Sequence, residues 1–193
     1  KSDYKGIVVA HGTDTMQYSG AFLSFALSGY PIPIALVGSQ RSSDRPSSDA
    51  AQNLISAVRF VVESKTRGVF VVMHHNEEDD LVVAHLGTRV RKNHTSKRGA
   101  FQTIGDNPAF IIAENQIQKN LSEEFFKTDK FQPRIKLDTK VALVKYYPGY
   151  DPKLLDQIID MDYRGIIFEG TGLGHINVNE IDEFIAIHEH FLS

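Results

Sequence analysis

Three short apolar runs recur in the first half of this chain, and a segment with helical periodicity separates each run from the next. The runs are Ile7 to Ala10, Ile34 to Val37 and Val69 to Met73. This alternation is typical of a parallel sheet whose strands are joined by crossover helices. Because the runs contain no polar residue, we expect central strands that are buried on both faces. With a fourth strand expected at Leu81 to His85, the sequence predicts an α/β fold.

Two amphipathic segments connect these strands. Met16 to Leu27 carries apolar residues at helical spacing and ends before Gly29 and Pro31. Pro46 to Glu63 carries a second apolar stripe, and residues 47–49 are expected to supply its N-cap side chains. Together with the strands, these helices predict a βαβαβ unit.

Regular patterning is lost over residues 114–138 and then returns. That stretch is polar and has no clear period, so we expect a long connection or linker. Strands are expected at residues 141–146 and 165–168, a helix opened by Asp151 between them, and a final helix from about Asn179.

These patterns divide the chain into two parts. We expect residues 1–138 to form a domain with a parallel, Rossmann- or flavodoxin-like sheet, and residues 139–193 to form part of a smaller α/β domain. The chain opens almost directly on a strand and closes within a helix. We therefore expect a fragment of a longer protein.

Composition argues against several classes of function. The net charge of -3 gives no field that would draw the chain to nucleic acid, so direct nucleic-acid binding is not expected. The absence of cysteine excludes disulfides, a thiol nucleophile and thiolate metal sites in these 193 residues. No apolar stretch approaches the ~20 residues of a membrane span, so we expect a cytoplasmic protein without a membrane partner.

Thr13 and Asp14 directly follow the first strand and are the first candidates for chemistry, because open α/β sheets bind ligands where strands end. Helix capping is the main alternative for both. A threonine hydroxyl needs a base to become a nucleophile, and a lysine beside a carboxylate can serve. Lys92, in the polar loop after the fourth strand, is the best-placed lysine, although such a lysine is usually solvated.

Three other stretches have simpler explanations. The serine-rich loop 39–49 either binds a polar substrate or serves only as a loop and helix cap. The glycine-rich turn 170–174 matches neither a dinucleotide fingerprint nor a Walker loop, so we expect a tight turn. His74-His75 and the pair at 188 and 190 lack further ligands at suitable spacing, so no metal site is expected.

Taken in chain order, these motifs resemble the asparaginase/glutaminase family. The matching stretches are His11 to Met16, Val37 to Arg41, Arg45 to Asp49 with Asn53-Leu54, Gly68 to Met73, and Lys92 to Thr95. The sequence of the serine-rich loop resembles that of one branch of the family, the D subunits of archaeal glutamyl-tRNA(Gln) amidotransferases. Free asparaginases more often carry Asp-Gly-Pro where this chain has Asp49-Ala50-Ala51.

The resemblance implies a catalytic role for three residues. Thr13 would be one of two catalytic threonines, Asp14 its acidic partner that also holds the amino group of the substrate, and Lys92 the basic member of the triad. The family's other threonine lies in an N-terminal Thr-Gly-Gly-Thr-Ile-like turn, which this sequence lacks. We therefore expect this polypeptide alone to be inactive.

The resemblance also implies substrate-binding residues. His11 and Gly12 would shape the floor of the pocket, Ser39 would contact substrate through its backbone, and His175 would be offered to the site of a neighbouring subunit. The family forms dimers or larger assemblies, which implies a homodimer.

The implied reaction is hydrolysis of the side-chain amide of glutamine or asparagine, with release of ammonia. In the amidotransferase branch, a tRNA-binding partner subunit would carry ATP and Mg and would use the ammonia to amidate Glu-tRNA(Gln). No cofactor is expected on this chain. The alternatives are a free cytosolic L-asparaginase and a catalytically silent interaction domain of the same fold.

Overall fold

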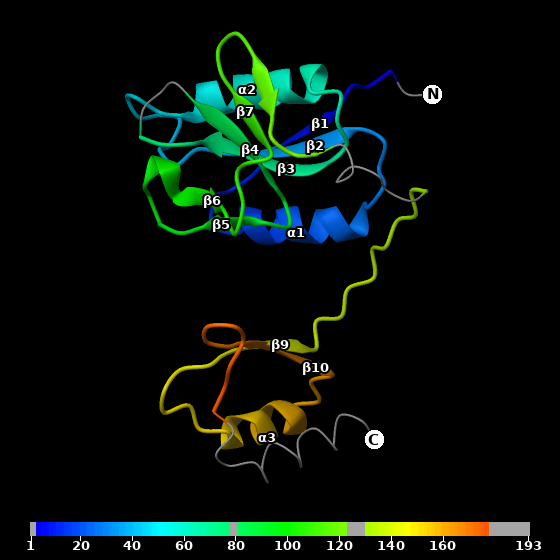
Figure 1. Ribbon diagram of the computed structural model, residues 1–193, viewed down its shortest axis with the longest axis vertical. Helices are drawn as coiled ribbons and strands as arrows, with labels where there is room; N and C mark the ends of the chain where they lie inside the picture. Colours follow the sequence, from blue (N-terminus) through cyan, green and yellow to red (C-terminus); the bar gives the residue numbers. More distant parts are fainter. Residues whose placement is uncertain (1–2, 78–80, 123–129, 178–193) are drawn as a thin grey trace. The chain divides into compact units, whose positions relative to one another are not determined.

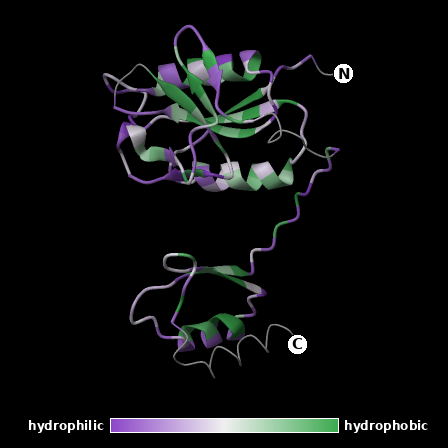
Figure 2. Ribbon diagram, viewed as in Figure 1, coloured by the Kyte–Doolittle hydropathy of each residue, from purple (hydrophilic) through white to green (hydrophobic). Residues whose placement is uncertain are grey.

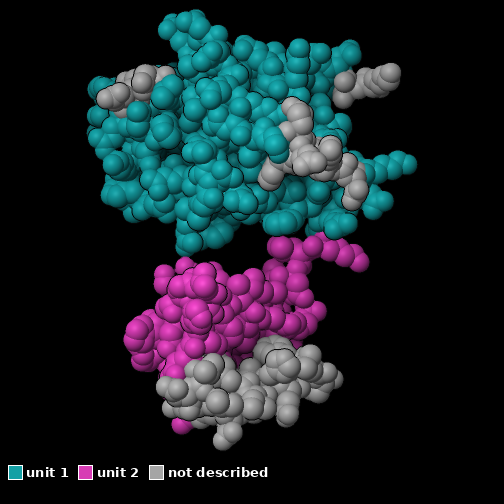
Figure 3. Space-filling model, in the orientation of Figure 1, with its two compact units in different colours: residues 1–135 teal, residues 136–193 magenta. Residues whose placement is uncertain are grey.

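The computed structural model describes residues 3–77, 81–122 and 130–177. The chain divides into two compact units, residues 1–135 and 136–193 (Figure 3). Within the described residues, no helix is long and apolar enough to cross a membrane.

The larger unit is built on a six-stranded sheet with a helix on each face (Figure 1). In spatial order the strands are β1 (Ile7–Ala10), β2 (Pro33–Val37), β3 (Gly68–His74), β4 (Val82–Leu86), β7 (Phe110–Ile112) and β8 (Ile117–Lys119). The first three strands pair in parallel, whereas β4, β7 and β8 are each antiparallel to the neighbour before them. The α/β class is therefore confirmed, but the sheet is mixed rather than parallel throughout. The short connection from β3 to β4 can join only antiparallel strands.

The position of β1 differs from the prediction. Among the described residues β1 pairs with β2 alone and lies at the edge of the sheet, and Ile7 is 37% exposed. The expectation of three central strands is therefore wrong for β1. Apolar composition by itself cannot distinguish an edge strand from a central one, because it reports on the two faces of a strand and not on its two edges.

Two strands of this sheet escaped sequence analysis. β7 has three residues, and β8 lies inside the polar stretch 114–138 that was expected to be a connection only. A strand of three residues is too short to show a reliable alternation of polar and apolar positions. Pairing with a neighbouring strand, rather than local pattern, defines it.

The two helices begin where polar loops end. α1 (Met16–Ala26) closely matches its predicted range, and α2 (Ala50–Glu63) begins after the loop of residues 46–49. Thr15 and Asp49 occupy the N-cap positions, but neither side chain makes a capping hydrogen bond. Neither Thr13 nor Asp14 is the N-cap of α1, so helix capping does not explain these two residues.

α1 and α2 cover opposite faces of the sheet. Leu36 of β2 shares a core with Met16 of α1, whereas the next residue, Val37, shares a core with Phe60 of α2. Successive strand residues point to opposite faces. Because β1, β2 and β3 are parallel and adjacent in order, helices on opposite faces require crossovers of opposite hand. One of the two connections is therefore left-handed, which is rare in parallel sheets.

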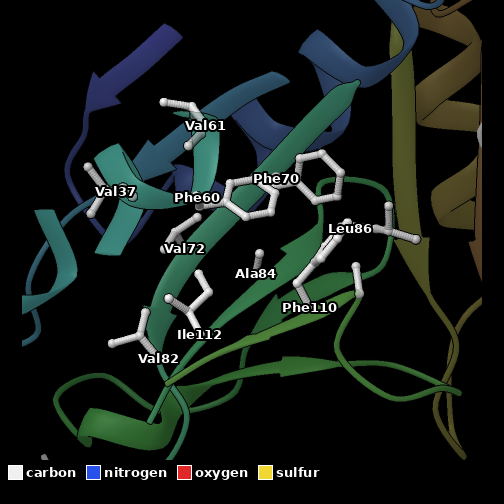
Figure 4. Packing of buried hydrophobic residues seen from close by; sticks show 13 residues of the cluster. Val37, Phe60, Val61, Phe70, Val72, Val82, Ala84, Leu86, Phe110 and Ile112 are labelled. Carbon is white, nitrogen blue, oxygen red and sulfur yellow. The ribbon is translucent and has the colours of Figure 1, made fainter. Parts of the chain in front are cut away.

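Aromatic packing dominates the core on the α2 face. Phe60, Phe70 and Phe110 are fully buried and meet edge to face, with ring centroids 4.9, 5.1 and 5.7 Å apart (Figure 4). Each such pair contributes ~0.5–1.5 kcal/mol beyond the burial of its area. The strands that supply this core are the most hydrophobic part of the unit, as the green ribbons in Figure 2 show.

A small hairpin covers part of the α1 face. It consists of β5 (Val90–Lys92) and β6 (Phe101–Thr103), which pair antiparallel and are separated by the 3-10 turn η1 (Arg98–Ala100). Val90 and Phe101 pack into the same core as Met16 of α1. Lys92 is therefore the last residue of a strand, which corrects its predicted place in a loop.

The smaller unit is a βαβ arrangement. β9 (Val141–Lys145) and β10 (Gly165–Glu169) pair in parallel, and α3 (Lys153–Asp160) connects them, as the sequence predicts. Val144 and Leu155 are its buried core residues. The helix expected from Asn179 lies outside the described residues.

Candidate active site

The turn after β1 and the end of β5 bring Thr13, Asp14 and Lys92 together. Lys92 Nζ donates hydrogen bonds to Thr13 Oγ1 at 2.9 Å and to Asp14 Oδ1 at 2.6 Å. The lysine is 78 positions from Asp14 in the sequence, so only the fold creates this cluster. Its side chain is 7% exposed, whereas that of Asp14 is 91% exposed.

This geometry contradicts one of the alternatives for Lys92. The lysine amine is buried against a hydroxyl and a carboxylate, so the interpretation of a solvated lysine is wrong. A distance of 2.9 Å between Nζ and Oγ1 lies within the range for direct proton transfer. When the amine is neutral, it can therefore accept the proton of the Thr13 hydroxyl or, through that hydroxyl, the proton of a water molecule.

Backbone contacts hold Lys92 at this position. Its N–H donates to Gln17 Oε1 at 2.7 Å, and the next N–H, that of Asn93, donates to Ala100 O at 2.8 Å. Gln17 lies in the first turn of α1, directly after the Thr13 turn. The same helix therefore positions both halves of the cluster.

A glycine allows β2 to end close behind the Thr13 turn. A Cβ on Gly38 would lie 2.5 Å from His11 O, 2.8 Å from Met16 Cε and 3.2 Å from Thr13 Cγ2. The N–H of His11 donates to Val37 O at 2.9 Å, which ties the two strand ends together. Gly38 and the residues after it are thus next to the cluster.

The predicted pocket-floor residues lie in the same turn. His11 Nδ1 is 2.7 Å from Gly12 O, and its Nε2 is 2.9 Å from Ser19 Oγ. A carbonyl oxygen only accepts, so Nδ1 carries the proton, and in the neutral ring Nε2 accepts from the Ser19 hydroxyl. The imidazole is thereby fixed beneath the turn, and Gly12 is exposed.

Ser39 follows β2 in a loop whose backbone N–H groups are bound by the buried Asp49 carboxylate. The Asp49 carboxylate accepts the N–H of Gln40 at 3.0 Å and the N–H of Arg41 at 2.9 Å. Asp49 is 1% exposed, and behind it lie Asn53 and His74, both fully buried. Asp49 was expected to cap a helix, and Asn53 was noted only in a stretch that matches the family. The position of Asn53 within the apolar stripe of α2 was the available signal.

His175 belongs to the smaller unit. Its backbone forms a bridge with Thr171, at 2.9 and 2.8 Å, and its side chain is exposed. Its expected role toward a neighbouring subunit stays a prediction.

Another buried histidine supports the hairpin that carries Lys92. His85 of β4 shares a hydrogen bond of 2.8 Å between Nδ1 and Thr103 Oγ1 of β6. Burial, with a smaller contribution from His75, lowers the pKa of His85 from the usual 6.5 to about 3. The ring is therefore neutral at physiological pH and serves packing rather than acid–base chemistry.

Metal-ligand clusters were also considered. Across residues 3–77, 81–122 and 130–177, no group of three or more His, Cys, Asp or Glu side chains could hold a metal ion. His188 and His190 lie outside the described residues.

Comparisons with known proteins give matches over most of the chain. Residues 1–124 match the family model described as "Asparaginase, N-terminal". The D subunit of the glutamyl-tRNA(Gln) amidotransferase from Pyrococcus furiosus is 50% identical over 176 residues, which are 90% of this chain and 40% of that protein. The corresponding protein from Methanopyrus kandleri is 46% identical over 182 residues, which are 91% of this chain and again 40% of its own length. The chain thus spans about 40% of the length of these curated relatives.

A solved structure is also similar. The thermostable L-asparaginase from Thermococcus kodakarensis superposes with a TM-score of 0.84 at 28% identity, covering 97% of this chain and 55% of that one.

Proposed function

Because the chain belongs to the asparaginase family, we propose that it supplies the threonine–aspartate–lysine part of an amidohydrolase site for glutamine or asparagine. The observation that carries this proposal is the Lys92 amine, which is buried and hydrogen-bonded to both Thr13 and Asp14. A base held against a hydroxyl beside a carboxylate is the arrangement that acyl chemistry needs.

The reaction assigns a task to each group. A second threonine, contributed by sequence beyond these 193 residues, is the nucleophile: its oxygen bonds to the acyl carbon, the C–N bond breaks, and the nitrogen takes up the threonine proton and leaves as ammonia. Lys92 then accepts, through Thr13, a proton from water, whose oxygen bonds to the acyl carbon. The ester C–O bond breaks, the threonine oxygen regains a proton and a free acid remains, so this polypeptide alone is inactive.

Asp14 is suited to hold the substrate's amino group. Oδ1 is fixed by Lys92 at 2.6 Å, and 91% of the side chain is open to solvent. A substrate ammonium group can form a charge-assisted hydrogen bond to such a carboxylate. Ser39 contributes backbone groups on the other side of the turn, above the pocket floor of His11 and Gly12.

The curated relatives are named as amidotransferase subunits, and this supports a use for the ammonia. A partner subunit that binds tRNA, ATP and Mg would consume it to amidate Glu-tRNA(Gln) in the cytoplasm. The likeness to an L-asparaginase structure supports a second candidate, a free L-asparaginase that needs no partner. In both cases the assembly proposed is a homodimer of the full-length chain, to which His175 contributes, with no cofactor of its own.

The test is ammonia release by the full-length protein that contains this chain. Glutamine and asparagine are assayed with and without the partner subunit, for wild type, Lys92→Met and Lys97→Met. We expect Lys92→Met to lower kcat by about three orders of magnitude, the middle of the range for loss of an acid–base group.

Lys97→Met is the matched control, because Lys97 is half exposed and its ammonium pairs with Glu77 at 3.1 Å. It should retain wild-type kcat. Full activity in Lys92→Met overturns the proposed function. Activity on asparagine without any partner favours the free asparaginase.

A further inference from the structure

A fully buried carboxylate lies beneath the loop that follows β2. Asp49 Oδ2 accepts hydrogen bonds from the N–H of Gln40 at 3.0 Å and from Asn53 Nδ2 at 2.9 Å, while Oδ1 accepts the N–H of Arg41 at 2.9 Å. Asp49 occupies the N-cap position of α2, but its side chain makes no capping hydrogen bond. Its carboxylate therefore acts on the loop rather than on the helix.

Asn53 and His74 extend this contact into the core. Asn53 Nδ2 also donates to Gly38 O at 3.0 Å, and Asn53 Oδ1 is 2.6 Å from His74 Nδ1. Because the amide NH2 faces a carboxylate and a carbonyl, its oxygen must face the histidine, and His74 Nδ1 must donate. Both residues are 0% exposed. Asp49 and Asn53, four positions apart, lie on the same face of α2.

These contacts fix two successive peptide planes around Ser39. The carbonyl of Gly38 points at Asn53, so the N–H of Ser39 points the opposite way in the trans peptide. The N–H of Gln40 points at Asp49, so the carbonyl of Ser39 also points away. Within the described part of the chain, neither backbone group of Ser39 has a hydrogen-bond partner.

The location of this loop links it to the candidate active site. Gly38 lies against the Thr13 turn, where a Cβ would be 3.2 Å from Thr13 Cγ2. The N–H and C=O of Ser39, the next residue along the chain, are therefore close to the Thr13 turn.

We propose that Asp49, Asn53 and His74 form a positioning network that presents the Ser39 backbone to the amide substrate. The inference rests on the proposed amidohydrolase function and deepens it, because it assigns substrate orientation to residues that touch no substrate. Burying three polar side chains is costly unless each is paired. An apolar trio would hold α2 on the sheet as well, but it would leave the peptide planes around Ser39 free to rotate.

The network is tested by steady-state kinetics on the full-length protein, with Asp49→Asn, His74→Ala and His74→Asn. Asp49→Asn replaces one acceptor oxygen with an NH2 group that faces a backbone donor. We expect its KM to rise about tenfold or more with little change in kcat, the signature of lost binding shared by ground and transition state. A variant that merely folds less well would instead lower the apparent kcat.

His74 provides a conservative rescue. His74→Asn places an amide nitrogen where Nδ1 lies and keeps a donor for Asn53, whereas His74→Ala removes it. KM should rise several-fold in His74→Ala and stay within about twofold of wild type in His74→Asn. Asp44→Asn, an exposed change in the same loop, is the matched control. Should Asp49→Asn fail to fold, the His74 pair decides.

Product binding gives a readout without turnover. L-glutamate and L-aspartate are titrated by calorimetry into Lys92→Met, with and without Asp49→Asn, and a weaker affinity in the double variant is expected. The inference is overturned if the wild type is active and both Asp49→Asn and His74→Ala keep its KM, or if His74→Asn is as impaired as His74→Ala. A wild type that releases no ammonia overturns the proposed function instead.

Discussion

Asp14 and Asp49 have similar places in the sequence, since each follows an apolar strand and precedes an amphipathic helix. Their environments are opposite. Asp14 is 91% exposed and holds one lysine, whereas Asp49 is 1% exposed and accepts three N–H donors. The exposed carboxylate is open to a ligand, and the buried one is committed to shaping its own loop. Local sequence, which would allow either to cap a helix, does not distinguish them.

The largest expected effect breaks the buried side of this comparison. Asp49→Ala would leave the N–H groups of Gln40 and Arg41 and the Asn53 amide without their acceptor. The Asn53 contact is buried and the two backbone contacts are partly buried, and an unsatisfied buried donor costs ~1–3 kcal/mol, so we expect a loss of ~1–3 kcal/mol in stability. Urea unfolding followed by fluorescence and circular dichroism measures it. A loss below that of an ordinary surface substitution would show that the buried carboxylate contributes little.

A second prediction extends the comparison to a buried group that is neutral rather than charged. The folded protein holds the pKa of His85 at about 3, and the unfolded chain returns it to 6.5. Between pH 3 and pH 6.5 only the unfolded chain binds this proton. The contribution of His85 to stability is therefore fully present above pH 6.5 and is lost as the pH falls toward 3. The slope from this residue reaches ~1.4 kcal/mol per pH unit.

His85→Asn removes that titration and keeps a group able to bond Thr103. Between pH 7 and pH 4, the urea midpoint of the wild type should therefore fall relative to the midpoint of the variant. Parallel curves would contradict the shifted pKa of His85.

The smallest effect on stability is expected at the exposed carboxylate. Asp14→Ala removes the exposed half of an ion pair, and the buried Lys92 amine keeps Thr13 Oγ1 as an acceptor, so we expect a loss of stability within ~1 kcal/mol. The urea midpoint should hardly change, while ammonia release by the full-length protein falls sharply because the substrate's amino group loses its partner. An Asp14→Ala variant that loses much stability, or that keeps full activity, would contradict the different roles of Asp14 and Asp49.

Much of the fold was accessible from the sequence. The apolar runs gave the strand positions of β1 to β4, and periodicity gave α1, α2 and α3, because burial of one helix stripe leaves a local pattern. β5 to β8 were missed or misplaced. They have three residues each, and their existence depends on partners far away in the chain.

The candidate site shows the same division. Thr13 and Asp14 were identified from their place after a strand, and Lys92 from its type and the family resemblance. The contact between them spans 78 positions, and no local property of either segment encodes it. The hydrogen bonds of Asn53 and His74 were not predicted, since a single polar residue in an apolar pattern does not reveal its partner.

Short-range patterns of apolar and polar residues were thus enough to predict the α/β class, the main strands and helices, and the residues able to carry amide chemistry. They could not predict which carboxylate faces solvent, which is enclosed, and which lysine reaches the threonine. Those outcomes depend on which strand ends meet at one edge of the sheet, and that is settled by packing between segments distant in sequence.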